Sequence, residues 1–333
     1  MKFRNLGKTG ISVSEIGLGT WEMSGDVWGK KDDSVSLKAL RTGIEYGANF
    51  IDTAAGYGAG HVEKLIGSLI RQDPYLRDKL VISTKVKPEC GQFAPPPERE
   101  ICDFYSPNWI RKQCEESLSR LGTDYIDILF LHTWSGAWGH ESEWYDELLR
   151  LKSEGKIRSF GISIPDEGIR DANVQIALGM VDVIQCVFNV FQQEPLYSLF
   201  PLALKNNVGI VARSPFSSGV VVQDWSVNMK FPDGDWRGIW PLDVKPGWLK
   251  EQVDMADIIK PILAKSGTPF SIAALKFVLS SLEVSSVIPG SANPLHVISN
   301  LSASELEVSQ DIIEEIRSLW KAHKVKGTYN GSI

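Results

Sequence analysis

The chain has 333 residues, 43% of them hydrophobic and 23% charged, and its 35 Lys and Arg against 41 Asp and Glu give a formal net charge of −6. This apolar fraction is typical of a folded protein and excludes an intrinsically disordered chain. The acidic balance argues against a general binder of nucleic acid or of anionic membranes, and no apolar run is long enough to span a bilayer. We therefore expect neither a nucleic-acid partner nor a membrane partner.

Short apolar runs with the character of buried strands recur along the chain. Each is apolar over most of its length, as in a parallel sheet covered on both faces. Between them lie amphipathic segments such as 33–47 and 108–122, which both end on glycine, a common helix stop. We predict strands at residues 14–19, 49–53, 79–85, 125–132, 157–163, 181–187, 208–214 and 285–290.

Eight strands that alternate with helices fit either a (β/α)8 barrel or an open, doubly wound sheet. A dinucleotide-binding open sheet would carry G-x-G-x-x-G after its first strand. Here Gly17 and Gly19 are followed by T-W-E-M, without a third glycine at that spacing. Because no linker or shift in composition divides the chain, we predict an α/β fold with a single TIM barrel domain, residues 1–333.

Two segments are longer than ordinary connections, and we expect both at the C-terminal face of the barrel. One runs over 86–107 and the other over 222–248. Loops of this length are usually functional or disordered. The aromatic residues of the second loop argue against disorder, because disordered segments contain few aromatic residues. The second loop carries four of the 11 tryptophans of the chain, namely Trp225, Trp236, Trp240 and Trp248.

The cysteines and the N-terminus indicate the compartment. The N-terminal segment has no apolar stretch behind its basic start, so we expect no signal peptide, reduced thiols and a cytoplasmic protein. None of the cysteines has zinc-ligand spacing with another cysteine or a histidine, and we predict no metal site. The four are Cys90, Cys102, Cys114 and Cys186.

Polar residues at the ends of barrel strands are the first candidates for a site, because those ends meet at one face. Asp52 ends the second predicted strand and Tyr57 lies on the loop after it. Lys85 ends the third strand and His132 the fourth. Any one of these is more often an ion pair or a packed side chain. All four, spaced by successive strand–helix units, are expected to converge.

At these positions the chain resembles the aldo-keto reductase family, from residue 3 to about 320. The resemblance implies that Asp52, Tyr57, Lys85 and His132 form the catalytic tetrad of an NAD(P)H-dependent oxidoreductase. Such an enzyme reduces an aldehyde or ketone, with Tyr57 as the general acid. The matching motifs are GLGTW (17–21), FIDTAAGYGAGHVEKLIG (50–67), ISTK (82–85), LFLH (129–132), GIS (161–163), Gln185, RSPFSSGV (213–220) and VIPGSANPLHVISN (287–300).

The chemistry of the four residues fits these roles. A tyrosine with a pKa of about 10 is a reluctant acid near neutrality, and a nearby ammonium lowers that pKa. Lys85 is placed to do this, and Asp52 to keep Lys85 charged. His132 is suited to polarise the carbonyl group by a hydrogen bond.

The resemblance also implies a cofactor site, with three departures from the family pattern. Ile164 stands where an Asn is expected, and Arg213 where an aromatic ring often stacks on the nicotinamide. No Lys or Arg lies between Lys276 and Arg317, the segment that grips a 2′-phosphate in NADPH-preferring members. The family favours NADP(H), with NAD(H) as the alternative. The implied cofactor residues are Gly19, Thr20, Trp21, Ser163, Gln185, Arg213, Ser214, Pro215, Phe216, Gly219, Gly290, Ser291, Asn293, His296 and Asn300.

Tryptophans near the strand ends predict an aromatic substrate pocket, suited to a sugar or another polar ring and hence to carbohydrate metabolism. The alternative is that they only fix the long loops to the barrel. A second class of function stays open as well, because the family includes potassium-channel β subunits: a cofactor-binding regulatory module on the same fold. The predicted substrate-binding residues are Trp21, Trp28, Trp134 and Trp138.

Overall fold

The computed structural model describes residues 1–96, 98–138, 142–239 and 247–325. Eight strands follow one another around a sheet, and every neighbouring pair is parallel. Bridges from Ile16 to Val287 and from Gly19 to Gly290 join the last strand to the first. The strands are β3 (Leu18–Gly19), β4 (Phe50–Asp52), β5 (Val81–Val86), β6 (Ile126–Leu131), β7 (Ile157–Ser163), β8 (Val183–Val187), β9 (Gly209–Arg213) and β10 (Val284–Ile288).

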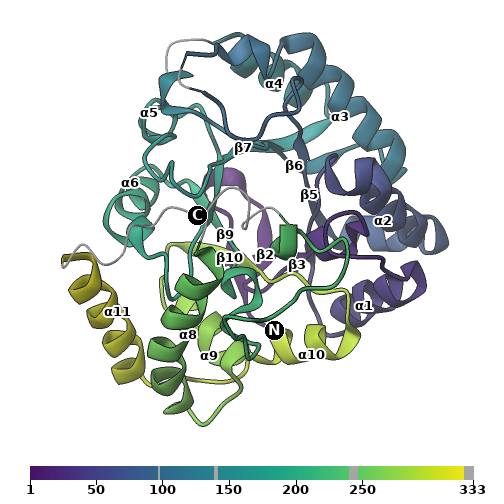
Figure 1. Cartoon of the computed structure of the whole chain (residues 1–333). Coiled ribbons are helices and arrows are strands. Elements are labelled where there is room, and N and C mark those ends of the chain that lie inside the picture. The colour runs from purple at the N-terminus through teal and green to yellow at the C-terminus, as the bar shows by residue number, and fades with distance from the viewer. Residues whose placement is uncertain (97, 139–141, 240–246, 326–333) are drawn as a thin grey trace.

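The helices lie outside this ring of strands (Figure 1). The predicted TIM barrel is therefore confirmed, while the single-domain boundary 1–333 stays a prediction. The α-helices are α1 (Asp33–Glu45), α2 (His61–Gln72), α3 (Pro107–Leu121), α4 (Glu143–Ser153), α5 (Asn173–Ala177), α6 (Leu199–Lys205), α8 (Trp248–Ala264), α9 (Phe270–Leu279), α10 (Pro294–Ser302) and α11 (Gln310–Val325).

Helix α3 shows how local sequence sets these boundaries. The Ser106 hydroxyl accepts a hydrogen bond from the backbone N–H of Trp109, and Pro107 occupies the first turn, where its missing N–H costs nothing. Gly122 ends the helix in the left-handed conformation, with φ 67°. The helix predicted over 108–122 is thus confirmed to within one residue at each end.

A hairpin that the sequence analysis did not predict closes the N-terminal end of the barrel. Strands β1 (Phe3–Asn5) and β2 (Ser12–Ser14) pair antiparallel. Leu6 and Val13 are buried in one cluster with barrel residues such as Phe130. Each strand has three residues, which is too short for a hydrophobic period to be read.

The second long loop folds back across the face of the barrel. We call its described part, residues 222–239, the strap. The strap pairs with the loop after β3 through a bridge between Trp28 and Asp235 and a 2.8 Å hydrogen bond from Trp236 N to Val27 O. Trp240 lies outside the described residues, and Trp248 is the first residue of α8. The strap is thus an ordered cover, as its aromatic content predicted.

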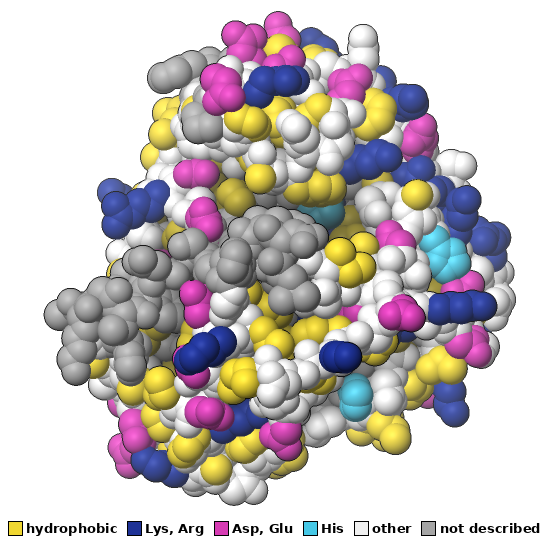
Figure 2. Space-filling view, in the orientation of Figure 1, with side chains coloured by type: hydrophobic (Ala, Val, Ile, Leu, Met, Phe, Trp, Pro, Cys, Tyr) yellow, Lys and Arg dark blue, Asp and Glu magenta, His cyan; other side chains and the backbone are white. Residues whose placement is uncertain are grey.

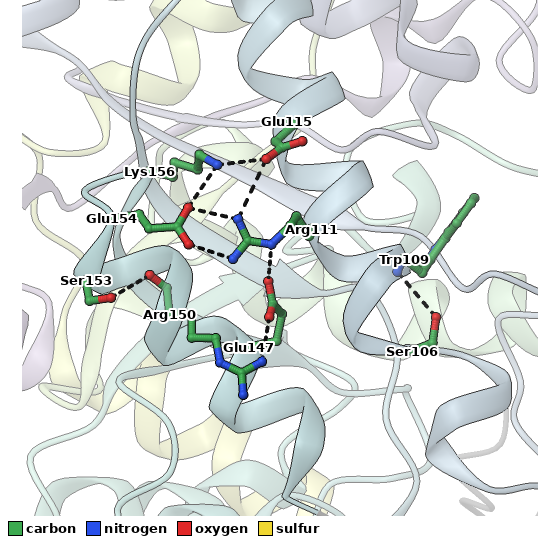
Figure 3. A network of polar contacts seen from close by, with 9 residues as sticks. All are labelled: Ser106, Trp109, Arg111, Glu115, Glu147, Arg150, Ser153, Glu154 and Lys156. Carbon is green, nitrogen blue, oxygen red and sulfur yellow. Dashed lines mark hydrogen bonds and ion pairs between the residues drawn. The ribbon is translucent and has the colours of Figure 1, made fainter.

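A network of ion pairs links α3, α4 and the start of β7 on the outside of the barrel (Figure 3). Arg111 contacts Glu147 and Glu154, each at 2.7 Å. Lys156 reaches Glu154 at 2.9 Å and Glu115 at 2.7 Å. Because several charges share partners, this network holds two neighbouring helices in register better than one isolated surface pair would.

Candidate active site

The four predicted catalytic side chains meet at the C-terminal ends of β4, β5 and β6. The Lys85 ammonium donates to Asp52 Oδ2 at 2.7 Å and to the Thr53 carbonyl at 2.8 Å. It lies 3.4 Å from the Tyr57 hydroxyl. The rings of Tyr57 and His132 are 5.8 Å apart, edge to face. One short chain of contacts therefore connects all four residues, as their spacing in the sequence indicates.

The loop that carries Tyr57 has an unusual backbone. Gly58, Ala59 and Gly60 follow one another with φ of 58°, 51° and 86°. Three consecutive residues in the left-handed region require small side chains, and a Cβ on Gly60 would lie 2.6 Å from the Arg120 side chain. The non-glycine Ala59 in this region is a strained position of the kind found at functional sites.

A buried carboxylate that sequence reasoning missed supports this loop from behind. Glu63, on the first turn of α2, is fully buried. It accepts a 2.6 Å hydrogen bond from the Thr84 hydroxyl and pairs with Arg120 at 2.5 Å. Because Thr84 precedes Lys85 in β5, Glu63 ties the helix that follows Tyr57 to the strand that carries Lys85. The signal in the sequence is a glutamate among the apolar residues of V-E-K-L-I-G.

The Asp52 carboxylate is held on both oxygens. Besides Lys85 on Oδ2, its Oδ1 accepts from the Ser83 hydroxyl at 2.7 Å and from the Gln185 amide at 2.8 Å. The Ser163 hydroxyl in turn donates to Gln185 Oε1 at 3.4 Å. Hydrogen bonds of this kind stabilise an ionised carboxylate in a buried position. Two of the predicted cofactor residues thus belong to the same buried network as the tetrad.

Burial and neighbouring charges set the ionisation of the tetrad. Burial opposes the charged form of Lys85, but Asp52 and Tyr57 outweigh it and raise the pKa of Lys85 above its ordinary value. Burial raises the pKa of Tyr57 above 10, although Lys85 and Arg213 act in the opposite direction. The expected lowering by Lys85 is therefore present, but it is smaller than the effect of burial. Tyr57 remains a protonated phenol at neutral pH, which is the form a general acid needs.

His132 is neutral in this environment. Burial, and then the positive charges of Lys85 and Arg213, hold the pKa of His132 well below its usual 6.5. The Phe93 ring packs nearly perpendicular to the imidazole, with ring centroids 4.9 Å apart. Among the described residues, Nδ1 of His132 is buried without a hydrogen-bond partner. A neutral imidazole with a free ring nitrogen is equipped to hydrogen-bond a small ligand.

Arg213 is anchored where β9 ends. Its Nη2 pairs with Asp166 at 2.5 Å and donates to the Ile164 carbonyl at 3.1 Å. Ile164, which stands where an Asn is expected, thus supplies its backbone oxygen to Arg213 instead. In the loop that follows β9, Ser214, Ser217 and Ser218 all have positive φ. The guanidinium is therefore fixed beside the tetrad, and the loop after it has a backbone typical of ligand-binding turns.

The residues at the strand ends fit a nicotinamide carboxamide. Ser163 and Gln185 place a hydroxyl and a primary amide next to each other, buried, within the network of Asp52. Both kinds of group donate and accept, as a carboxamide partner must. Thr20 is engaged differently, because its buried hydroxyl donates to the Asp52 carbonyl at 2.8 Å. Pro215, Phe216 and Gly219 lie in the loop with the strained serines.

The residues predicted for the adenosine end gather around the start of α10. Asn293 caps this helix, with Oδ1 accepting from Leu295 N at 2.9 Å. Asn300 is buried and His296 exposed. A side chain at Gly290 would meet no atom within 4 Å. These predicted adenosine-binding residues thus lie near one another at the edge of the barrel, where β10 ends and α10 begins.

Three tryptophans form one side of the site, which we call the aromatic wall: Trp21, Trp28 and Trp236. The Trp21 ring stacks with Tyr57 and with Trp236, at centroid distances of 6.3 Å and 6.0 Å, and makes an edge-on contact with Trp28 at 5.2 Å. Trp21 is 40% exposed. Figure 2 shows hydrophobic side chains gathered near the middle of the molecular face in view. The predicted substrate-binding residues do not include Trp236, because nothing in the sequence shows that the strap returns to β3.

The structure does not place Trp134 and Trp138 in this wall, and their assignment to the substrate pocket stays a prediction. Their exposed fractions are 0% and 2%, and they pack against each other and against Trp144 and Phe104. The Trp138 indole N–H donates to the Arg99 carbonyl at 2.7 Å. These contacts favour the alternative, in which the two tryptophans fix a long loop to the barrel.

Arg237 connects the strap to the rest of the site. Its guanidinium makes two hydrogen bonds to the buried Asp235, at 2.9 Å and 2.6 Å, and donates to the Ser218 carbonyl at 3.0 Å. It also lies 4.8 Å from the centroid of the Trp28 ring. The strap, the aromatic wall and the loop after β9 are therefore held together by one cation.

Comparison with known proteins agrees with this geometry. The model of the aldo/keto reductase family matches residues 15–321. The chain belongs to the aldo/keto reductase family. As the sequence predicted, it is therefore an oxidoreductase that uses a nicotinamide cofactor.

Curated relatives and solved structures match over nearly the full length. The NADH-specific methylglyoxal reductase of Escherichia coli K12 is 29% identical over 323 residues, covering 93% of this chain and 95% of the relative. L-galactose dehydrogenase of Arabidopsis thaliana is 28% identical over 331 residues, covering 96% and 94%. The structure of glycerol dehydrogenase AKR11B4 of Gluconobacter oxydans superposes with a TM-score of 0.76 at 24% identity, covering 96% and 95%. The last similarity shows the fold alone.

Proposed function

We propose that the protein reduces an aldehyde or ketone to the alcohol, with Tyr57 as the general acid. The observation that carries this proposal is the position of the Tyr57 hydroxyl, 3.4 Å from the Lys85 ammonium and beneath the partly exposed Trp21. A carbonyl group bound at this point would contact the Tyr57 hydroxyl as its proton donor. The Lys85 ammonium lies beside that hydroxyl and would stabilise the tyrosinate left after proton transfer.

In this mechanism each residue of the tetrad has one task. The bound nicotinamide would supply the hydride. Tyr57 donates its proton to the carbonyl oxygen as negative charge develops there, and Lys85 stabilises the tyrosinate that remains. Asp52, through its 2.7 Å contact, keeps Lys85 charged and in place. His132, being neutral, donates a hydrogen bond to the same oxygen and polarises the carbonyl.

The substrate class that fits the aromatic wall is a sugar or another polar ring. Such a molecule presents an apolar face for stacking and hydroxyl groups at its edge, which suits an exposed indole. Trp21 offers that face beside the Tyr57 hydroxyl. One of the relatives is named for a sugar substrate, L-galactose. A role in carbohydrate metabolism and a cytoplasmic location stay predictions.

The choice between NADP(H) and NAD(H) depends on the start of α10. Family resemblance favours NADP(H), which the sequence analysis placed first. Against it stand the absence of Lys and Arg between Lys276 and Arg317 and a relative named as NADH-specific.

A panel of aldehydes and ketones, including aldoses, tests the proposed reaction. With NADH or NADPH in excess, the reduced-nicotinamide absorbance should fall only when both the protein and a carbonyl compound are present. The largest kcat/KM is expected for a ring-forming substrate. Tight binding of a nucleotide without turnover of any compound would instead favour the regulatory module on the same fold.

A further inference from the structure

We propose that Glu22 is a specificity-determining residue through which this enzyme selects NAD(H) over NADP(H). The inference rests on the proposed nicotinamide site, and it concerns residues 289–293, between β10 and α10, where the adenosine end of the cofactor is predicted to lie.

Donors in this turn are already engaged within the protein. The Asn293 backbone N–H donates to Ser291 Oγ at 3.0 Å, and the Ser291 hydroxyl donates back to the Asn293 carbonyl at 3.3 Å. The Asn293 side chain accepts from Leu295 N to cap α10. The groups that the sequence left as candidates for gripping a phosphate therefore bond each other. The N-terminus of α10 is capped by its own chain.

A further backbone N–H of the turn is bonded by an acidic side chain. Glu22 lies on the 3₁₀ helix η2 (Trp21–Ser24), directly after the first barrel strand. Its Oε2 accepts from the Ala292 backbone N–H at 3.3 Å, across 270 residues of sequence. Its Oε1 pairs with Lys31 at 3.1 Å. Lys31 thus holds the Glu22 carboxylate in position. Because Lys31 is ion-paired with Glu22, its ammonium is already engaged within the protein.

This arrangement distinguishes the two nucleotides by charge and by hydrogen bonding. A 2′-phosphate carries more than one negative charge near neutral pH, and it would meet a carboxylate with no uncommitted Lys or Arg on the segment. A ribose with a free 2′-hydroxyl is a donor, and an Asp or Glu that accepts from it is a general means of selecting NAD over NADP. Glu22 is both the repulsive element and the acceptor.

Gly290 provides a second, independent test. A Cβ at this position would meet no atom within 4 Å, and the φ of Gly290 is not in the left-handed region, so the backbone accepts a residue with a side chain. A lysine here would place a cation in front of the turn without disturbing Glu22.

The experiment measures Kd for NADH and for NADPH by quenching of tryptophan fluorescence. It uses the wild-type protein and the variants Glu22→Gln and Gly290→Lys. Asp26→Asn removes an exposed carboxylate four residues from Glu22, and Leu282→Lys adds a cation at a highly exposed site in another loop. These two controls match the change in net charge. A melting curve for each variant checks that it folds.

We expect the wild type to bind NADH at least about tenfold more tightly than NADPH, a difference that one unfavourable charge contact is able to supply. Glu22→Gln should narrow that ratio by about tenfold, and Gly290→Lys should narrow it as well. Both controls should keep the wild-type ratio.

Three results would overturn the proposal: a wild type that prefers NADPH, a ratio of the two Kd values that is unchanged in Glu22→Gln, or controls that shift this ratio as much as the test variants do. A wild type that binds neither nucleotide would contradict the proposed function as well. Selective NADH binding that does not respond to Glu22→Gln would leave the proposed function intact and exclude Glu22 as the selecting residue.

Discussion

At the scale of single residues, the site depends on groups whose ionisation is set by burial. Tyr57 is kept protonated and His132 neutral, while Lys85 is kept charged by the Asp52 carboxylate. Each state matches the task proposed for it, since the acid has a proton to give and the ammonium is ready to stabilise the tyrosinate. The same burial makes these states insensitive to pH over a wide range.

The expected consequence is a flat pH profile for carbonyl reduction. Because the pKa of His132 lies well below 6.5 and that of Tyr57 above 10, neither group titrates between those values. Thus kcat/KM for reduction should be constant across this interval, fall above it as Tyr57 loses its proton, and fall only well below it as His132 gains one. Oxidation of the alcohol needs the tyrosinate and should rise towards alkaline pH. A decline in reduction centred near pH 6.5 would show that His132 is not held neutral.

At the scale of elements, the strap does most to shape the pocket. It returns Trp236 to the aromatic wall, while Arg237 joins it to the Ser218 carbonyl and the Trp28 ring. Sequence reasoning identified the strap as functional from its length and tryptophans. The contacts of Trp236 with Trp21 and Trp28 were not predictable, because they join segments about 200 residues apart. Trp134 and Trp138 were predicted in the pocket because they follow the fourth barrel strand, but packing against neighbouring aromatic rings buries them.

The variant Trp236→Ala tests the aromatic wall. Losing one face of the stack should raise KM for a ring substrate by about two- to tenfold, the equivalent of 0.5–1.5 kcal/mol for an aromatic pair. KM for a small aldehyde, which does not reach the wall, should change little. Trp236→Phe keeps an aromatic face and should restore most of the affinity. An equal rise in KM for both substrates would indicate a general collapse of the strap rather than loss of stacking.

For the whole molecule, the barrel was predictable because its strands are buried on both faces and read as continuous apolar runs. Strand β7, for example, occupies 157–163 as predicted. The order of the strands then follows from the parallel βαβ connection. The hairpin of β1 and β2 and the buried Glu63 were not predictable. The strands of the hairpin are too short to show a hydrophobic period. The role of Glu63 depends on Thr84 and Arg120, which only the fold brings close to it.

The ion-pair network of α3 and α4 predicts how the whole molecule responds to acid. Arg111 and Lys156 lower the pKa of Glu154 from 4.5 to about 2. A carboxylate with a lowered pKa in the folded state stabilises the fold above its ordinary pKa, and this contribution is lost as the pH falls towards the folded value. The Tm of wild type should therefore exceed that of Glu154→Gln at neutral pH, and the two should converge between about pH 4.5 and 2. A difference in Tm that stays constant over this range would exclude an ionic origin.

The central claim is that Tyr57 donates the proton in a nicotinamide-dependent carbonyl reduction, and Tyr57→Phe tests it most directly. The substitution removes one hydroxyl and leaves the ring stacked on Trp21. We predict that the variant keeps the wild-type Tm and binds NADH or NADPH within about twofold of wild type. Its kcat for reduction should fall by about 10²–10⁴-fold, the usual contribution of a general acid. Reduction at close to the wild-type rate would contradict the claim.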